Sequence, residues 1–361
     1  MNYRIDENAG EPAYIQLYRL LVKDIESGIY PPDTKLPSKR TIAGEVGVSL
    51  ITAEHALALL CDEGYVEARQ RSGYFVIYHE GDFLRGSVET AGTVLPPVLP
   101  QPAHSGSEFP YTVLARTMRK VLLDYGDRIL VKSPNHGCPE LRNEICRYLA
   151  RSRGITVKPQ QVIIGSGAEY LYGLIAQLMG KDTIFAIEKP CYDKIPKVYE
   201  AMGICCDALS LTPEGIATAE LERTKARVLH VTPFHSFPTG ISVGISKKKE
   251  YLHWASERKG IIIEDNYDSE MTVSRKAEDT LFSMAEDVQV IYINTFSKTI
   301  APSMRIGYLL LPEALTGSFN ETLGFYSCTV PLFEQYVLAQ LLQSGDFERH
   351  VNRVRRKKRK T

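Results

Sequence analysis

A lysine in the C-terminal half of the chain follows an apolar run and stands among residue types that bind phosphate. Residues 290–293 are apolar, and Thr295, Ser297 and Lys298 come directly after them, with Arg305 a little further on. A lysine amine can condense with an aldehyde to form a Schiff base. Hydroxyls, backbone N–H groups and an arginine are suited to holding a phosphate. The pattern therefore indicates chemistry on a phosphorylated aldehyde.

A second apolar run, about thirty residues earlier, delivers an acid and a phenol. Residues 261–263 are apolar, and Asp265 and Tyr267 follow them. An acid beside a pyridine nitrogen favours the protonated ring through charge pairing, and such a ring withdraws electrons. One amine, one acid and one phenol at strand ends are what an enclosed pyridoxal 5'-phosphate (PLP) needs. The sequence therefore predicts a PLP cofactor, with Lys298 as the Schiff-base residue.

The composition limits the other classes of function. The 361 residues have room for two domains, and the 43 basic side chains balance the 43 acidic ones. No apolar run reaches the roughly 20 residues of a membrane span, and the N-terminus lacks the apolar core of a signal peptide. The seven cysteines include no C-x-x-C pair, which favours reduced thiols and no metal site. These features predict a cytoplasmic protein.

The first 80 residues have the pattern of a small helical domain with a two-stranded ribbon. Apolar spacing predicts three helices within residues 11–63, and Ser38 and Ser49 are suitable N-caps for the second and third. Two strands, 65–69 and 74–78, follow. Three short helices and a ribbon in this order predict a winged helix-turn-helix domain over residues 1–80.

The rest of the chain is a linker followed by alternating helices and strands. Residues 81–110 are rich in proline, which predicts a semi-extended linker. From residue 111 to 361 helical patterns alternate with short apolar strands, which indicates an α/β domain with a largely parallel sheet covered by helices. The predicted strands are 162–164, 183–187, 228–231, 261–264, 290–293 and 306–311. Ligands of such sheets lie at the carboxyl ends of the strands.

The N-terminal segment resembles the GntR family of winged-helix regulators. The resemblance is carried by residues 36–40, the stretch 48–60, the stretch 63–69 and residues 73–76. It implies that the second helix of the turn enters the major groove of a double-stranded DNA operator and that the wing touches the neighbouring backbone. The implied DNA contacts are Lys39, Arg40, Ser49, Thr52, Arg69 and Arg71.

Two departures concern the strength of this DNA binding. Residues 1–80 contain 8 basic and 12 acidic side chains, so only a local basic face can attract phosphate. The GntR family usually has an arginine where this chain has Leu50. A winged helix that binds protein is the alternative, and Arg40 and Arg69 could each be a solvated surface charge.

Residues 111–345 resemble the large domain of fold-type I aminotransferases, and the closest match is the MocR subgroup of the GntR regulators. In this subgroup a winged helix is fused to such a domain. Matching stretches are residues 133–142, 165–170, 188–192, 232–240, 264–270 and 295–305. The resemblance implies a mostly parallel seven-stranded sheet with helices on both faces, and a homodimer.

The resemblance also assigns cofactor contacts. Tyr192 would stack on the cofactor ring, and Ser166, Gly167 and Ala168 would bring the phosphate to a helix N-terminus, where free N–H groups await it. Tyr267 would donate to the phenolate oxygen of the cofactor. The full implied set is Ser166, Gly167, Ala168, Tyr192, Asp265, Tyr267, Thr295, Ser297, Lys298 and Arg305. Tyr192 as a core aromatic and Asp265 as a helix cap are the alternatives from the residues alone.

The chain departs from the aminotransferase pattern in two ways. Phe237 stands where an asparagine commonly precedes Pro-Thr-Gly. The family continues for about another hundred residues, so the small C-terminal domain is expected to be largely missing, together with the arginine that grips a substrate carboxylate. We therefore expect a PLP-dependent transcription regulator that senses PLP or an amino compound. The alternatives are an active PLP-dependent aminotransferase with a DNA-binding appendage and a truncated gene product that binds DNA or PLP poorly.

Overall fold

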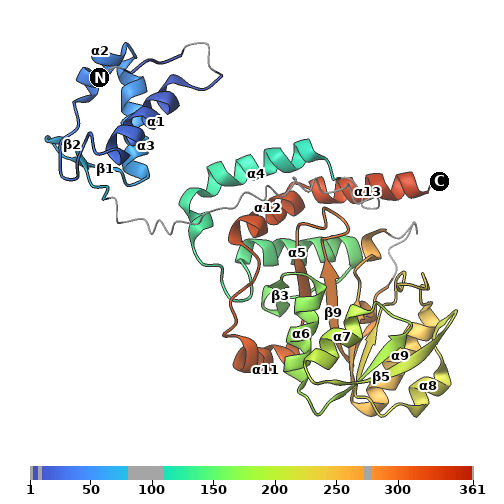
Figure 1. Ribbon diagram of the computed structural model, residues 1–361. Coiled ribbons are helices and arrows are strands. Elements are labelled where there is room, and N and C mark those ends of the chain that lie inside the picture. The colour runs from blue at the N-terminus through green and yellow to red at the C-terminus, as the bar shows by residue number, and fades with distance from the viewer. Residues whose placement is uncertain (1–2, 7–9, 80–108, 272–278, 360–361) are drawn as a thin grey trace, which may run out of the picture. The chain divides into compact units, whose positions relative to one another are not determined.

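The computed structural model describes residues 3–6, 10–79, 109–271 and 279–359. The chain divides into two compact units, Met1–Leu99 and Pro100–Thr361, which are described separately (Figure 1). Almost all of the predicted linker, residues 81–110, lies outside the described residues.

The smaller unit is the predicted winged helix-turn-helix. Its elements are α1 (Ala13–Glu26), α2 (Lys39–Val46), α3 (Leu50–Asp62), β1 (Val66–Arg69) and β2 (Gly73–Val76). The two strands pair antiparallel, with Val66 opposite Val76 and Arg69 opposite Gly73. Both predicted caps form, because the side chains of Ser38 and Ser49 accept hydrogen bonds from the first-turn N–H groups of α2 and α3.

The core of this unit is the apolar stripe that the sequence periodicity predicts. Leu17 and Leu21 of α1 pack against α3, and both are fully buried. Between α2 and α3 the chain turns at Gly47, whose φ of 77° suits a residue without a Cβ atom. The turn therefore orients α3 across α2, leaving the N-terminal end of α3 on the surface.

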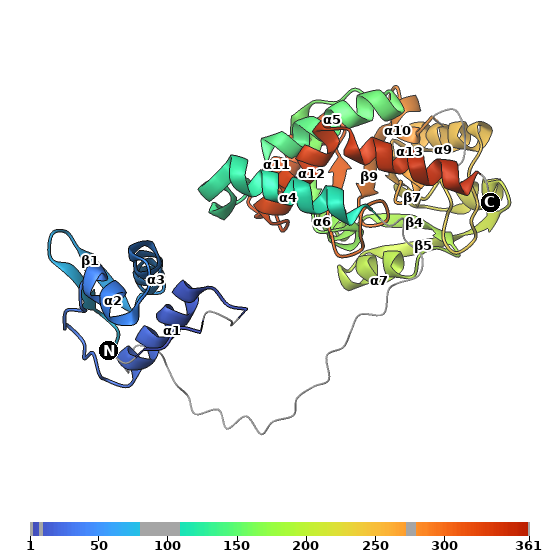
Figure 2. The same cartoon turned by 90° about the horizontal axis from the view of Figure 1, so that it is seen from above.

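The larger unit is an α/β domain (Figures 1 and 2). Its α-helices are α4 (Tyr111–Tyr125), α5 (Pro139–Arg153), α6 (Ala168–Met179), α7 (Lys194–Ala201), α8 (Thr218–Arg223), α9 (Ile245–Arg258), α10 (Leu281–Met284), α11 (Glu313–Leu323), α12 (Leu332–Gln343) and α13 (Asp346–Lys358). Short 3₁₀ helices are η1 (Gly126–Leu130), η2 (Pro159–Gln161) and η3 (Ser269–Met271).

One sheet runs through this unit in the order β3-β10-β9-β8-β7-β4-β5-β6. Its strands are β3 (Val162–Gly165), β4 (Ile184–Lys189), β5 (Cys205–Thr212), β6 (Gly215–Ile216), β7 (Val228–Val231), β8 (Ile261–Asp265), β9 (Gln289–Thr295) and β10 (Gly307–Leu310). The five strands from β9 to β5 pair in parallel, while β10 is antiparallel to both of its neighbours and β6 is antiparallel to β5.

Side chains alternate between the two faces of this sheet, and helices cover both. Ile263 and Leu309 point to the face packed by α6, α7 and α11. Ile262 points to α9, and Leu310 to α5 and α12. Because both faces are buried, the strands are apolar without interruption, which explains why they can be recognised in the sequence.

The prediction of a mostly parallel sheet with helices on both faces is confirmed, with two differences in detail. The sheet has eight strands in place of seven, because the two-residue β6 pairs at the edge. The other difference is β5, which apolar runs do not predict. Only Leu209 of its eight residues is buried, and polar side chains alternate through it.

In the described part of the chain, no single helix is long and apolar enough to cross a membrane. α2 and α3 pass that test only as a pair, on length and composition, and they are bent by 120°. Within the same residues, no group of three or more His, Cys, Asp or Glu side chains could hold a metal ion.

Candidate cofactor and DNA sites

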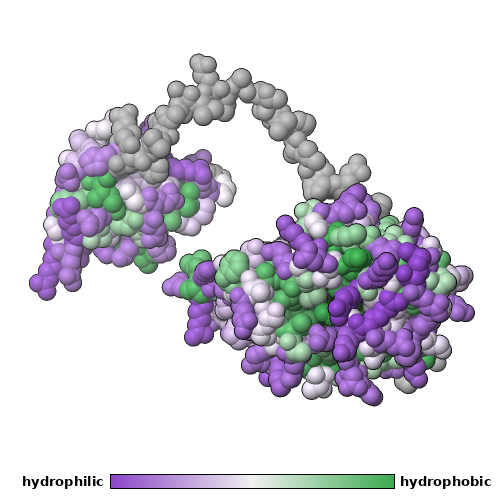
Figure 3. Space-filling model, turned by 90° about the horizontal axis from the view of Figure 1, so that it is seen from below, coloured by the Kyte–Doolittle hydropathy of each residue, from purple (hydrophilic) through white to green (hydrophobic). Residues whose placement is uncertain are grey.

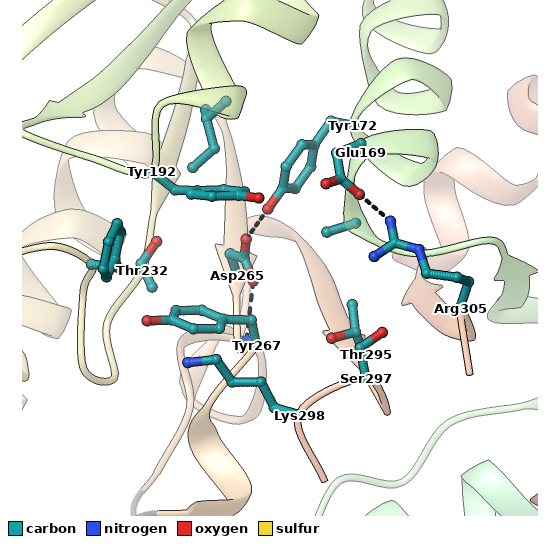
Figure 4. A pocket seen from close by; sticks show the side chains of 13 residues that line it. Glu169, Tyr172, Tyr192, Thr232, Asp265, Tyr267, Thr295, Ser297, Lys298 and Arg305 are labelled. Carbon is teal, nitrogen blue, oxygen red and sulfur yellow. Dashed lines mark hydrogen bonds and ion pairs between the residues drawn. The ribbon is translucent and has the colours of Figure 1, made fainter. Parts of the chain in front are cut away.

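The chemistry-bearing residues of the larger unit gather around one cavity of about 290 Å³ (Figure 4). It lies at the carboxyl ends of β7, β8 and β9, beside the N-terminus of α6, as expected for an α/β sheet. The cavity is lined by Ala168, Glu169, Tyr172, Tyr192, Ile195, Thr232, Phe237, Asp265, Tyr267, Thr295, Ser297, Lys298 and Arg305. Eight of the ten predicted cofactor residues are therefore brought together.

Asp265 ends β8 and is held from two sides. Its Oδ2 accepts a hydrogen bond from the Tyr172 hydroxyl, and its Oδ1 accepts one from the backbone N–H of Tyr267 at 3.1 Å. The residue is only 2% exposed. Both bonds fix the direction of the carboxylate, so a ring nitrogen placed in the cavity would meet an acceptor that is already oriented.

A second layer of polar side chains lies behind Asp265. His230 Nε2 is 3.8 Å from Asp265 Oδ2, and His230 Nδ1 is 2.7 Å from the Tyr199 hydroxyl. All three residues are buried. If the tyrosine donates to Nδ1, the proton of a neutral imidazole lies on Nε2, facing the carboxylate.

Lys298 lies in the loop after β9, near Tyr267 and Asp268. Its Nζ is 4.3 Å from the centre of the Tyr267 ring and 3.9 Å from Asp268 Oδ1. The side chain is 51% exposed, so the amine can be reached from the cavity. Cation–π and charge contacts of this kind hold an ammonium group in place without burying it.

The Tyr267 hydroxyl is bonded to the backbone of another segment of the chain. It donates to the carbonyl oxygen of His235 at 2.8 Å. Burial, together with the nearby charges of Asp268 and Asp265, raises the pKa of this phenol to about 12. The phenol is therefore a neutral donor. Donation to a cofactor oxygen would require it to leave the carbonyl, which the sequence could not reveal.

The start of α6 forms a close cradle with Arg305. Gly167 is the N-cap of the helix with a φ of 94°, and a Cβ atom there would lie 2.8 Å from Arg305 Nη2. Gly167 does not line the cavity itself, and neither does Ser166, whose N–H donates to Thr329 Oγ1 at 3.2 Å. The first N–H groups of a helix have no partner within it, so an anion can be held between them and the guanidinium.

Glu169 is an acid in this cradle that the sequence patterns do not single out. It accepts from Arg305 Nη2 at 2.6 Å and from Lys194 Nζ at 2.7 Å. Burial raises its pKa, but the bonds from Lys194 and Arg305 and a backbone N–H outweigh burial and lower the pKa to about 2. The guanidinium keeps further N–H groups beyond the one that meets Glu169, so it can still bind a phosphate.

The aromatic side of the cavity is formed by Tyr192 and Phe237. Their ring centres are 6.3 Å apart, with an edge-to-face angle of 77°. In Figure 4 the Tyr192 ring lies across the cavity from Lys298, a position suited to stacking on a flat ligand. Phe237 is 55% exposed and has no polar side-chain atom to offer.

The donor set fits PLP. The cavity joins a reachable amine, a buried oriented carboxylate, an aromatic face and a phosphate cradle that a Cβ atom at Gly167 would fill. Five lining residues lie outside the predicted cofactor set: Glu169, Tyr172, Ile195, Thr232 and Phe237. Tyr172 and Glu169 belong to α6, whose apolar periodicity shows which face is buried but not which side chain reaches a strand end.

In the smaller unit, the predicted DNA contacts lie at the surface of α2, α3 and the wing. Arg40 is exposed. Lys39 pairs with Glu54 of α3, with Nζ 2.9 Å from Oε1. Ser49 and Thr52 bond to each other through their hydroxyls at 2.8 Å as they cap α3. The hydroxyls of Ser49 and Thr52 therefore take part in capping the N-terminus of α3.

The wing carries its two arginines on the ribbon. Arg69 lies 4.4 Å above the Phe75 ring and pairs with Glu67 at 3.2 Å. Arg71 lies at the exposed tip with a φ of 63°. Arg40, Arg69 and Arg71 are all exposed, although the unit as a whole is acidic.

Both parts of the chain match known families. Residues 13–76 match the bacterial regulatory proteins of the gntR family, and residues 104–361 match aminotransferase class I and II. An uncharacterised HTH-type transcriptional regulator, YdeL of Bacillus subtilis, is 33% identical over 97% of this chain and 77% of its own length. The probable rhizopine catabolism regulatory protein MocR of Rhizobium meliloti is 28% identical over 98% and 76%.

The chain belongs to the MocR-type regulators of the GntR family. The pyridoxine biosynthesis transcriptional regulator PdxR of Corynebacterium glutamicum is a further relative, 29% identical over 97% of the chain and 77% of its own length. The chain is thus a DNA-binding transcription regulator with an aminotransferase-like, PLP-binding domain. It spans about three quarters of the length of these MocR-type relatives.

Solved aminotransferases share the fold of the larger unit. The α-aminoadipate aminotransferase LysN of Thermus thermophilus is 25% identical over 70% of this chain and 66% of its own, with a TM-score of 0.62. The kynurenine aminotransferase of Pyrococcus horikoshii is 24% identical over the same shares, also with a TM-score of 0.62. The chain therefore spans slightly less than two thirds of these enzymes.

Proposed function

We propose that this MocR-type regulator uses the cavity of its larger unit to sense PLP, or an amino compound that reacts with PLP, and that ligand binding alters its affinity for an operator. The observation that carries the proposal is the single cavity that joins Lys298, Asp265 and the Gly167–Arg305 cradle in a chain that also has a winged helix.

Each residue of the cavity has a defined task. Lys298 supplies the amine, Asp265 accepts from the ring nitrogen, Tyr192 covers one ring face, and the α6 N-terminus with Arg305 holds the phosphate. PLP contributes a reactive aldehyde and an electron-withdrawing ring, to which an amino compound can bind covalently. Thr295 and Ser297 complete the cradle at the carboxyl end of β9.

The cofactor assignment can be tested on the intact protein. With PLP added, the protein should absorb at the Schiff-base band, and borohydride should fix the label on Lys298. Peptide mapping of the reduced protein then locates the label. The Lys298→Ala protein should show no label, while Lys249→Ala, a change at an exposed lysine of α9, should be labelled as in the wild type. A label on another lysine would contradict the assignment.

We further propose that DNA is bound through residues 36–73, with Arg40, Arg69 and Arg71 on phosphates. Arg40→Ala should abolish operator retention in a mobility-shift assay and leave the PLP absorption unchanged. Arg19→Ala is a matched control, because Arg19 lies on α1, is 68% exposed and pairs with Glu11. Binding should weaken steeply with salt, since each phosphate contact releases counterions. Unchanged binding by Arg40→Ala would refute this placement.

Sensing requires that the ligand bind two arrangements of the protein with different affinity. Operator affinity of the PLP-loaded protein should therefore change when the correct amine is added, by about 5- to 150-fold for a typical coupling of about 1–3 kcal/mol. A panel of amines and amino acids can be screened by fluorescence anisotropy on a labelled operator. The response should be absent in Lys298→Ala.

The rate of transamination distinguishes an active aminotransferase from a sensor. Phe237 offers no side-chain hydrogen bond at the cavity rim, and Arg305 is assigned to the phosphate. A substrate carboxylate would then be poorly fixed, which misaligns the bond to be broken. Steady transamination of any common amino acid with 2-oxoglutarate, at about 1 per second or faster, would favour an enzyme.

A homodimer is part of the proposal. Apolar side chains on α4 and η1 and just after η1 are exposed in the isolated unit: Tyr111 79%, Leu122 48%, Leu123 85%, Leu130 80% and Val131 59%. The space-filling view also shows apolar residues on the surface of this unit (Figure 3). Such a patch marks an interaction surface, and a second copy would cover it. As a DNA-binding regulator, the protein is placed in the cytoplasm by this proposal.

A further inference from the structure

The exposed end of α3, which a helix-turn-helix places in the major groove, is apolar and acidic. Leu50 and Ile51 are 41% and 66% exposed, and the Glu54 side chain is 51% exposed. The sequence of α3, from Leu50 to Asp62, contains neither lysine nor arginine. The commonest specific contact in the major groove, arginine or lysine to guanine, is therefore unavailable to this helix.

These three residues lie on the side of α3 that faces away from the core. The opposite side carries Ala53, Ala56, Leu57 and Leu60, which are fully buried. Positions i and i+4 share one face of a helix, so Leu50 and Glu54 lie one above the other, with Ile51 beside them. His55, the next exposed residue, is engaged with the Tyr14 ring at 5.7 Å. Leu50, Ile51 and Glu54 together form what we call the α3 reading face.

A carboxylate in a DNA groove is repelled by phosphates unless a cation accompanies it. Here Lys39 of α2 lies 2.9 Å from Glu54 Oε1. The pair offsets the charge of Glu54 and holds one of its oxygens, while the other oxygen keeps its accepting capacity. Arg40, Arg69 and Arg71 are exposed on the same unit and can meet phosphates. This charge pattern favours DNA over a protein as the occupant.

We propose that the α3 reading face recognises cytosine through Glu54 and thymine methyl groups through Leu50 and Ile51. A carboxylate accepts from the N4 amino group of cytosine, and apolar side chains contact the C5 methyl of thymine. Lys39 is the positioning residue that directs Glu54. The inference rests on the proposed DNA binding and adds the bases that the operator presents to each α3.

The test selects binding sites for the full PLP-loaded chain from a randomised DNA duplex pool, using wild type, Glu54→Gln and Asp62→Asn. Asp62 is exposed at the other end of α3, so its change removes the same charge away from the reading face. Wild type and Asp62→Asn should share a cytosine position in each half-site. Glu54→Gln should lose that preference by about 5- to 150-fold, since one good contact discriminates by about 1–3 kcal/mol.

The apolar contacts are tested by removing only a methyl group from the DNA. Replacing thymines by deoxyuridine in the selected duplex should weaken the wild type about 4-fold for each contacted methyl. Ile51→Ala should be less sensitive to that replacement, while its affinity for a scrambled duplex stays unchanged. Lys39→Ala should relax the cytosine preference, which mere loss of a phosphate contact would not do.

The outcomes separate this inference from the function on which it rests. If the wild type enriches no sequence, DNA binding by this unit is refuted together with the inference, and a protein partner becomes the occupant of the reading face. If the wild type enriches a site whose base preferences are the same in Glu54→Gln, the inference alone is refuted. A selected site to which the wild type binds equally well after deoxyuridine replaces thymine in both strands would refute the methyl contacts.

Discussion

Each carboxylate oxygen of Asp265 already accepts a hydrogen bond from a neighbour. The Tyr172 hydroxyl donates to one oxygen and a backbone N–H to the other. Burial raises the pKa of Tyr172 well above its usual value, and the nearby Asp265 adds to the effect, so the phenol stays a donor at neutral pH. A pyridine nitrogen would therefore find Asp265 fixed in direction and still able to accept.

Asp265→Ala should weaken PLP binding much more than Asp268→Ala. Asp265 is buried and would make a charge-assisted hydrogen bond to the ring, which is typically worth about 1.5–3 kcal/mol, or about 10- to 150-fold in affinity. Asp268 lies nearer the lysine, with Oδ1 3.9 Å from Lys298 Nζ. Its loss should mainly remove a charge contact of the Lys298 amine. Titration of both proteins with PLP compares them, and equal losses would show that the wrong acid is assigned.

Glu188 should make the free energy of unfolding depend on pH, with a contribution that is lost as the pH rises. It is buried at the end of β4, where its oxygens accept from Thr232 N–H at 3.2 Å and Ser236 Oγ at 2.8 Å. Burial outweighs these bonds and raises the pKa to about 7. The folded state therefore binds this proton more tightly than the unfolded state. Its contribution to stability is fully present below the unfolded pKa of 4.5 and is lost as the pH rises to about 7.

Glu188→Gln should remove this pH dependence. The shift corresponds to at most about 3 kcal/mol between about pH 4.5 and about pH 7. The free energy of unfolding of the variant should fall less than that of the wild type over this interval. Chemical denaturation at several pH values measures the difference. Glu200→Gln, a change at an exposed residue of α7, is the control. Parallel curves for wild type and Glu188→Gln would show that Glu188 is not protonated in the fold.

At the scale of the elements, the N-terminus of α6 does two things at once. Its first residues, Ala168 and Glu169, line the cavity, and Gly167 lets Arg305 approach the helix start closely. The same helix end supplies Glu169, which holds Arg305 from the other side. The phosphate cradle is therefore a property of how α6 and the segment before β10 meet, and not of any single residue.

Gly167→Ala should lower the affinity for PLP, whereas Gly180→Ala should not. Both glycines flank α6 and have positive φ, 94° and 80°, so the backbone strain of alanine is similar. Only at Gly167 does a Cβ atom meet a neighbour, Arg305 Nη2 at 2.8 Å, and near Gly180 nothing lies within 4 Å. Displacing the guanidinium should cost one charged hydrogen bond, about tenfold or more in PLP affinity. Similar titrations for both variants would contradict the cradle.

Elements whose burial is uniform could be predicted from the sequence, and those at the edge could not. β8 and β9 are buried on both faces, so their apolar runs stand out, and the residues at their ends fall where a parallel sheet puts them. β5 has a single buried side chain, and its polar alternation resembles a loop. In the winged helix, the caps Ser38 and Ser49 are local signals, and the structure has both.

The sequence predicts those residues of the cavity that directly follow a strand. Lys298, Asp265 and Tyr267 follow apolar runs, which place them. Tyr172 and Glu169 reach the same cavity from α6, and their part depends on how that helix packs on the sheet. The bond from the Tyr267 hydroxyl to His235 likewise depends on a segment thirty residues away in sequence. Such contacts follow from tertiary packing, which no local pattern encodes.

At the scale of the whole molecule, a sensor must link two units that each have a site of their own. The predicted DNA contacts lie on the smaller unit, and the residues that line the cavity belong to the larger unit. In the proposed sensor, coupling would arise if ligand binding changed how two copies of the chain present their winged helices to two half-sites. The oligomeric state is therefore the property of the whole molecule on which regulation depends.

Leu123→Asp should weaken dimerisation, and Ile245→Asp should not. Leu123 is 85% exposed on α4 within the apolar patch proposed as the dimer surface, while Ile245, 53% exposed, begins α9. A carboxylate placed in a covered apolar surface loses its hydration without a partner. The dissociation constant of the dimer should rise by at least about 30-fold, the equivalent of about 2 kcal/mol for a central interface residue. Sedimentation over a range of protein concentrations measures it.

Because both side chains are exposed, neither change should disturb folding, and the Schiff-base absorption of each variant checks that. A wild type that sediments as a monomer at all concentrations, or equal behaviour of the two variants, would remove α4 from the dimer surface.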